Sequence, residues 1–332
     1  MRMEPGADAA MGDTTGESGP GPLVEAVLLC RGPETVETLP FLKDLNELAQ
    51  PLGQRFAFEP DARPEGEGEV AVFQSEDFHV TVREVAAPAS AFTFSSALSD
   101  PCLPVTFPTA QAVVDGHVEH VVVRVNRGAW DAADTDLDLD DFQPDAMLPK
   151  LRLLKMACGA YARSRFPIAL YWSAADNLMA GPNFMQFVVE GGETELFVRA
   201  VPFSSGMDDG VPTVGVVTLG ATQVIGREVE LDEAPVPMAW AVQQVLAFVT
   251  HSGDALPPDG ATLRSENALL IAHHEAPSER FPFGRVRLSV EKPPARAVVD
   301  APPLAAEVLP VVEPVAVSDE PPRRVKAAFG RR

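Results

Sequence analysis

The sequence predicts an α+β fold, with a mixed, largely antiparallel sheet or pair of sheets packed by about four helices. Short apolar runs rich in β-formers outnumber the runs in which apolar residues recur at helical spacing. Several neighbouring strand-like runs have no helix between them, which favours this class over alternating βαβ units. The composition, 46% hydrophobic and 22% charged over 332 residues, is that of a globular protein with enough apolar residues for a core.

The chain is expected to begin with a disordered lead, followed by a strand and a helix. Residues 1–21 are mainly Gly, Ala, Asp, Ser and Pro and have little to bury. Val24–Cys30 is an apolar run typical of a strand, and the helix after it is ended by Pro51 and Gly53. The apolar residues that share one face of this helix are Phe41, Leu42, Leu45, Leu48 and Ala49.

Three more strands are expected before the middle of the chain. The strand-like runs are Glu69–Phe73, Phe78–Val85 and His117–Val125, with a loop rich in Pro and Ser at Ala86–Thr109. An acidic connector at Asp131–Asp145 then leads to a helix at Pro149–Arg165, which Pro167 prevents from continuing.

The segment after that helix predicts a strand, a turn and another helix. Ile168–Trp172 is an apolar run followed by the small polar residues Ser173–Asn177. Pro182 can begin a helix without losing a needed N–H, and Gly191-Gly192 can end it. The expected unit is therefore β-turn-α.

The remaining elements are strands and one helix. The strand-like runs are Leu196–Phe203, Val214–Leu219, Val229–Leu231, Ala268–Ala272 and Val286–Val290. The helix is expected at Pro237–His251, where Asp232 and Glu233 suit its N-terminus and Gly253 its end.

These elements predict a globular α+β domain over 22–291, followed by a linker and a tail. The domain is either one unit or two packed halves near 22–126 and 127–291. Lys292–Pro322 contains eight prolines and no apolar periodicity, which is typical of an extended spacer. The tail at 323–332, RRVKAAFGRR, is strongly basic.

Charge is separated between the tail and the rest of the chain. The net charge is −22, and because the tail carries five positive charges, the remainder carries −27. Such an acidic body repels phosphates, so the globular part is not expected to bind nucleic acid. The tail is a candidate motif for an acidic protein face, anionic lipid or nucleic acid, or it lies solvated against its own acidic domain. Its candidate contact residues are Arg323, Arg324, Lys326, Phe329, Arg331 and Arg332.

The sequence predicts a cytoplasmic protein. Its N-terminus has no apolar segment of a secretory signal, and no uninterrupted apolar run is long enough to span a membrane. The cysteines, Cys30, Cys102 and Cys158, are odd in number and far apart, which fits a reducing compartment and excludes a Cys-x-x-Cys metal or redox motif.

No catalytic residue, metal site or cofactor is predicted. The chain has neither a Gly-x-Ser-x-Gly elbow nor either common glycine-rich phosphate loop. Aspartates at alternate positions from Asp134 resemble the start of a calcium loop, but Leu139 replaces the glycine and Asp145 the glutamate that the loop requires.

One polar cluster is the best candidate for a ligand site, because it follows a strand at its C-terminal edge. It consists of Trp172, Ser173, Asp176 and Asn177. The alternative is structural: Ser173 or Asp176 caps the local backbone while Trp172 packs in the core.

Several ordered motifs resemble the bacterial domain-of-unknown-function family 4261 over about Leu23–Val290. They are AVLL at Ala26–Leu29, HVEHVVVRV at His117–Val125, ALYWS at Ala169–Ser173 with the apolar helix after it, VIGREVEL at Val224–Leu231 with its helix, and the pair Asp259-Gly260. The resemblance implies a soluble bacterial α+β domain and transfers no catalytic residue.

Two functional hypotheses follow. The first is a non-enzymatic protein-binding, regulatory or accessory protein that uses its acidic domain and tethered basic tail to meet a protein partner. The second is a hydrolase or small-ligand-binding enzyme with its site near Trp172–Asn177, which requires Asp176 and a histidine to lie within hydrogen-bonding reach.

Overall fold

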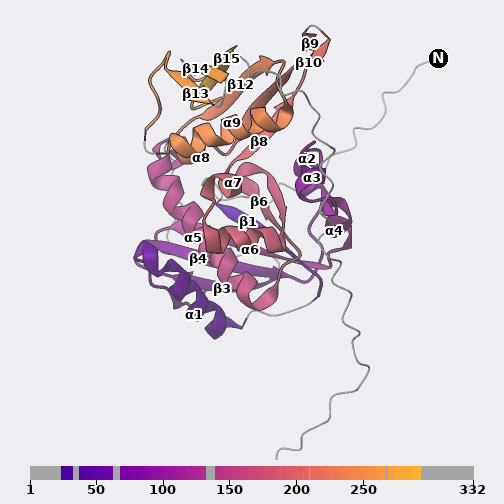
Figure 1. Ribbon diagram of the computed structural model, residues 1–332. Helices are drawn as coiled ribbons and strands as arrows, with labels where there is room; N and C mark the ends of the chain where they lie inside the picture. The colour runs from indigo at the N-terminus through magenta and orange to yellow at the C-terminus, as the bar shows by residue number, and fades with distance from the viewer. Residues whose placement is uncertain are drawn as a thin grey trace, which may run out of the picture. The chain divides into compact units, whose positions relative to one another are not determined.

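Two large β-sheets organise the chain in the computed structural model (Figure 1). The structure describes residues 24–32, 37–62, 68–131, 139–208, 210–253, 255–265 and 268–292, and all of them belong to one compact unit. The predicted N-terminal lead, the calcium-like aspartates before Leu139, nearly all of the proline-rich linker and the basic tail lie outside the described residues.

The first sheet has seven strands in the order β2-β3-β4-β5-β1-β6-β7, and every neighbouring pair is antiparallel. Alternation of side chains places Val80 and Val82 of β4 in the core, with Thr81 between them on the opposite face. The strands are β1 (Glu25–Cys30), β2 (Ala57–Phe58), β3 (Glu69–Gln74), β4 (Phe78–Val85), β5 (Glu119–Arg127), β6 (Ala169–Trp172) and β7 (Asn177–Ala180).

Helices cover both faces of this sheet around β1. Ala26 and Leu28 point into the main core beneath α1 (Thr38–Ala49), α5 (Pro144–Arg165) and α6 (Gly181–Glu190). Val27 and Leu29 point into a smaller core on the other face. The short helices there are η2 (Ala91–Phe94), α2 (Ser95–Leu98), α3 (Leu103–Thr106) and α4 (Ala110–Gly116).

The second sheet has six strands in the order β13-β14-β15-β12-β11-β8, and only its β12–β15 pair is parallel. Helix α9 (Met238–His251) packs against β8, β11 and β12 (Figure 1). The strands are β8 (Arg199–Phe203), β11 (Val214–Leu219), β12 (Glu228–Ala234), β13 (Thr262–Ser265), β14 (Ala268–Glu275) and β15 (Arg285–Lys292). A separate two-stranded ribbon joins β9 (Met207–Asp208) to β10 (Val211–Pro212).

Helix α5 connects the two sheets. It contacts β5 and β1 of the first sheet and α8 (Thr222–Ile225) beside the second. The remaining short helices are η1 (Gln50–Leu52), η3 (Leu139–Phe142), η4 (Ser173–Ala175) and α7 (Glu193–Phe197). Among the described residues, no helix combines the length and the apolar character that a membrane span requires.

The predicted α+β class is confirmed. The four predicted long helices correspond to α1, α5, α6 and α9, which are the described helices of ten or more residues. Helix α5 begins at Pro144 rather than at Pro149, because Pro144 occupies the first helical turn, where its missing N–H costs nothing. The predicted acidic connector is therefore shorter than Asp131–Asp145.

Two local predictions are wrong. Ala86–Thr109 is not a continuous loop, because Phe94, Ala97 and Leu103 anchor short helices to the sheet. The β-turn-α unit is a β-hairpin followed by a helix, since Asn177–Ala180 pairs with β6. Both errors have one cause: four-residue elements are too short to show a period in the sequence.

Gly181 at the start of α6 provides a stability prediction. A Cβ atom at this position would lie 1.8 Å from the backbone oxygen of Pro167, which cannot move aside as a side chain can. We expect Gly181→Ala to lower the free energy of unfolding by about 1–3 kcal/mol, measured by urea denaturation. Gly206→Ala is the control, because nothing lies within 4 Å of its added Cβ. Equal stability of the two variants would contradict the tight approach.

Candidate functional site

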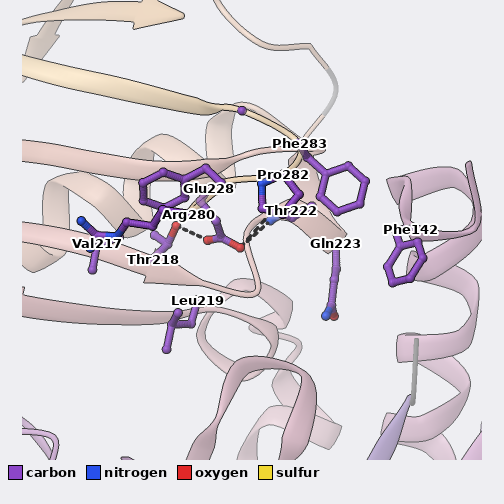
Figure 2. A pocket seen from close by; sticks show the side chains of 12 residues that line it. Phe142, Val217, Thr218, Leu219, Thr222, Gln223, Glu228, Arg280, Pro282 and Phe283 are labelled. Carbon is purple, nitrogen blue, oxygen red and sulfur yellow. Dashed lines mark hydrogen bonds between the residues drawn. The ribbon is translucent and has the colours of Figure 1, made fainter. Parts of the chain in front are cut away.

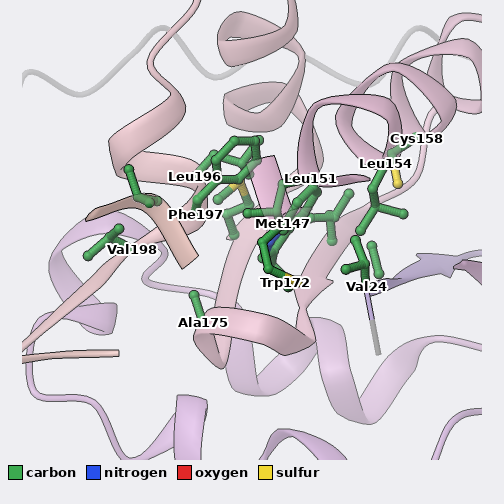
Figure 3. Packing of buried hydrophobic residues seen from close by; sticks show 14 of the residues in the cluster. Val24, Met147, Leu151, Leu154, Cys158, Trp172, Ala175, Leu196, Phe197 and Val198 are labelled. Atoms are coloured by element: carbon green, nitrogen blue, oxygen red, sulfur yellow. The ribbon is translucent and has the colours of Figure 1, made fainter. Parts of the chain in front are cut away.

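Trp172, the first residue of the predicted polar cluster, lies in the main core. It is fully buried and stacks on Phe197, with ring centroids 5.2 Å apart and an interplanar angle of 28°. Figure 3 shows the pair among buried residues that include Met147, Leu151 and Leu196. Among the described residues, no acceptor receives a hydrogen bond from the indole N–H. The side chain thus packs within the main core.

Ser173 and Asn177 hold the β6–β7 hairpin in place. The hydroxyl of Ser173 donates to the backbone oxygen of Glu25 at 2.5 Å. The side-chain amide of Asn177 donates to the backbone oxygens of Glu195 and Leu196 at 3.2 and 3.4 Å. These bonds attach the hairpin to β1 on one side and to α7 on the other.

Asp176 joins the two sheets through an arginine. Its carboxylate lies 2.8 Å from Nη2 of Arg199 on β8 and accepts a hydrogen bond from the Tyr171 hydroxyl at 2.9 Å. Arg199 also donates from Nη1 to the backbone oxygen of Asp176 at 2.6 Å, and its Nε lies 3.8 Å from a carboxylate oxygen of Asp100. Burial, and then the bond to Asp176, raise the pKa of Tyr171 well above its ordinary value. The arginine is 9% exposed, so this ion-pair contact between the two sheets is buried; we call it the joint.

The histidines of the described residues have other partners. His117 contacts the backbone of Val114 and Ala89, and it lies before β5 rather than in the strand. The adjacent His273 and His274 point apart, as expected for an extended segment: one bonds Ser289 and the other the backbone of Pro257. No hydrogen bond between Asp176 and a histidine occurs within the described ranges, and no group of three or more potential metal-binding side chains occurs there either.

A small cavity beside the joint offers little room for a ligand. It has a volume of about 140 Å³ and is lined in part by Asp100, Cys102, Asn177 and Arg199. Burial and the charge of Asp100 raise the pKa of the Cys102 thiol, which makes it a weak nucleophile. Arg199 in its wall is already paired with Asp100 and with Asp176.

A larger cavity, of about 390 Å³, is the candidate functional site (Figure 2). It lies at the end of β11 and the start of β12, between α8, the β14–β15 loop and η3. We call it the aromatic pocket, because Phe142, Phe281 and Phe283 contribute to its wall. The rings of Phe142 and Phe283 have centroids 5.7 Å apart and are tilted by 35°. Pro282, Leu219 and Val217 extend the apolar lining.

The loop that carries two of these rings has a defined turn. The Ser278 N–H donates to the backbone oxygen of Phe281 at 3.0 Å, and the Ser278 hydroxyl accepts a hydrogen bond from the Phe281 N–H at 3.2 Å. Gly284 closes the turn at φ +80°, where a Cβ atom would lie 2.6 Å from the backbone oxygen of Glu275. The sequence patterns considered above did not identify the segment Arg280–Gly284 as part of a site. Its Arg-Phe-Pro-Phe-Gly pattern is the feature that could have predicted a loop with exposed aromatic side chains.

Glu228 is the acidic residue of the pocket wall, and its carboxylate is already saturated. It accepts hydrogen bonds from the hydroxyls of Thr218 and Thr222 and from the backbone N–H groups of Gly220, Ala221 and Thr222. Figure 2 shows its bonds to the two threonines. These bonds define the start of α8. They leave the carboxylate no spare lone pair with which to accept a proton or bind a metal ion.

Two polar side chains of the pocket wall have an acceptor atom or a charge without a partner among the described residues. The Gln223 amide donates to the backbone oxygen of Ala174 at 3.3 Å, but its buried Oε1 has no donor among the described residues. The exposed Arg280 guanidinium lies 5.0 Å from the Phe281 ring centroid. Within the described ranges it has no carboxylate partner, whereas Arg285 nearby pairs with Glu230 and Glu275. Because the Gln223 oxygen is shielded from solvent, the group that the pocket offers to a ligand beside its aromatic walls is the Arg280 cation.

Comparison of the chain with protein-family models, with curated proteins and with solved structures found no match. The chemistry of the pocket itself is thus the basis for a functional assignment.

Proposed function

We propose that this protein is a non-enzymatic binding protein of a regulatory or accessory kind, and that its aromatic pocket holds a small, mainly apolar ligand. The observation that carries the proposal is the pocket of about 390 Å³ walled by Phe142, Phe281 and Phe283. Small-molecule sites are commonly concave, about 300–1,000 Å³ in volume, and lined by apolar and aromatic side chains with a few polar groups.

The polar groups of the pocket suit recognition better than bond making. Glu228 is occupied by hydroxyl and backbone donors, so it is poorly placed to accept a proton from a substrate. The Arg280 guanidinium has N–H donors and no acceptor, and an amide such as Gln223 is neither an acid nor a base. These groups suit the holding of a ligand better than a reaction with it.

Binding of a neutral aromatic probe tests this function. We expect phenylnaphthylamine, whose fluorescence rises in apolar surroundings, to bind the full chain with one-to-one stoichiometry. Phe283→Ala removes a wall of the pocket and should weaken binding at least tenfold, about 1.4 kcal/mol. Phe166→Ala is the matched control, because Phe166 is 79% exposed at the end of α5 and outside the pocket lining. No saturable binding, or equal loss in both variants, would refute the proposal.

A second proposal concerns the basic tail. Its five positive charges, against −27 on the rest of the chain, support a role in holding a protein partner. Partner capture by the full chain, but not by a chain ending at Glu291, would support this role. Equal capture by both would place the interaction on the globular unit. Membership of family 4261, bacterial origin and cytoplasmic location stay predictions.

A further inference from the structure

We infer that the ligand of the aromatic pocket is an aromatic carboxylic acid whose carboxylate pairs with Arg280. This inference rests on the proposed function, because it assigns a chemical class to the ligand of that pocket.

The carboxylate is inferred from the charge of the pocket. Arg280 is the cation in its lining, and within the described ranges it has no ion-pair partner. Neighbouring arginines of the second sheet are neutralised: Arg285 pairs with Glu230 and Glu275, and Arg287 with Asp232 and Glu275. A guanidinium binds a carboxylate through two parallel hydrogen bonds, which gives a planar acid a fixed orientation.

The aromatic ring is inferred from the walls. Phe142 and Phe283 come from η3 and from the β14–β15 loop, and both rings line the same cavity (Figure 2). Their faces and edges can contact a third ring in stacked or edge-to-face geometry. Arg280 lies over Phe281, so the site for the carboxylate adjoins the aromatic surface. A flat acid therefore fits the arrangement better than a flexible aliphatic acid.

Calorimetric titration with benzoate tests the inference, with methyl benzoate as the uncharged counterpart. We expect benzoate to bind the full chain at least tenfold more tightly than its ester. Arg280→Gln should remove the preference over the ester. Arg264→Gln, an equal change of charge on the exposed side of β13, should leave that preference unchanged.

The possible failures are distinguishable. Equal binding of acid and ester by the wild-type chain, or an acid preference that survives Arg280→Gln, would overturn the carboxylate inference and leave the proposed function intact. Failure of the neutral probe as well as the acid would overturn the proposed function too. Arg280 is exposed, so the variant is expected to fold, and its melting temperature verifies this.

Discussion

Replacing Arg199 with methionine is expected to lower the free energy of unfolding by about 3–5 kcal/mol. The guanidinium lies between Asp176 of the first sheet and Asp100 of the short helical segment, and both acids lose their cation in the variant. Only 9% of Arg199 and 8% of the Asp100 side chain are exposed, so water cannot replace the lost partner at low cost. Urea denaturation of the full chain measures the change.

Arg124→Gln is the matched control for Arg199→Met. Arg124 pairs with Glu25, but 43% of its side chain is exposed, and such pairs contribute about 0–1 kcal/mol. A triple variant that combines Arg199→Met with Asp100→Asn and Asp176→Asn should recover part of the lost stability, because it removes the stranded charges. A loss below about 1 kcal/mol for Arg199→Met alone would mean that the joint does not hold the two sheets together.

Replacing Trp172 with alanine is expected to cost about 3–5 kcal/mol. The indole is fully buried and stacks on Phe197, so its loss leaves a cavity in the main core beside Leu151 and Met147. The cavity cannot collapse easily, because the side chains beside the indole come from α5 and α7, and both helices also pack against other elements. Thermal and urea unfolding both report this loss.

Trp172→Phe separates packing from ligand binding. It retains most of the stacked surface and removes the N–H that has no partner within the described ranges, so it should cost clearly less than the alanine variant. Binding of phenylnaphthylamine should be unchanged in it, because Trp172 does not line the aromatic pocket. Loss of probe binding without loss of stability would instead assign a ligand-binding role to Trp172.

Local sequence signals predicted the long elements correctly for identifiable reasons. In β4 the core residues alternate with polar ones, and in α1 Phe41, Leu45 and Ala49 recur every four residues on the buried face. Such periods are visible in the sequence because each element buries one face continuously. The same reasoning missed β7 and the helices between β4 and β5, since four residues complete hardly more than one period.

The predicted site residues show what a local sequence pattern cannot predict. The sequence placed Trp172, Ser173, Asp176 and Asn177 together, and the structure keeps them adjacent but uses them to pack and fasten a hairpin. The partner that decides the role of Asp176 is Arg199, on a strand of the other sheet. No local pattern could identify that pairing.

By itself, the sequence determined the α+β class, the long helices and most of the strands, because propensity and hydrophobic period act within a few residues. Only the tertiary structure determined which residues form the aromatic pocket. Phe142, Gln223 and Phe283 are distant in the chain and meet because β12 pairs in parallel with β15 while α5 packs against α8. Which side chains are left with a free donor, acceptor or charge depends on these long-range contacts, and that choice defines what the protein can bind.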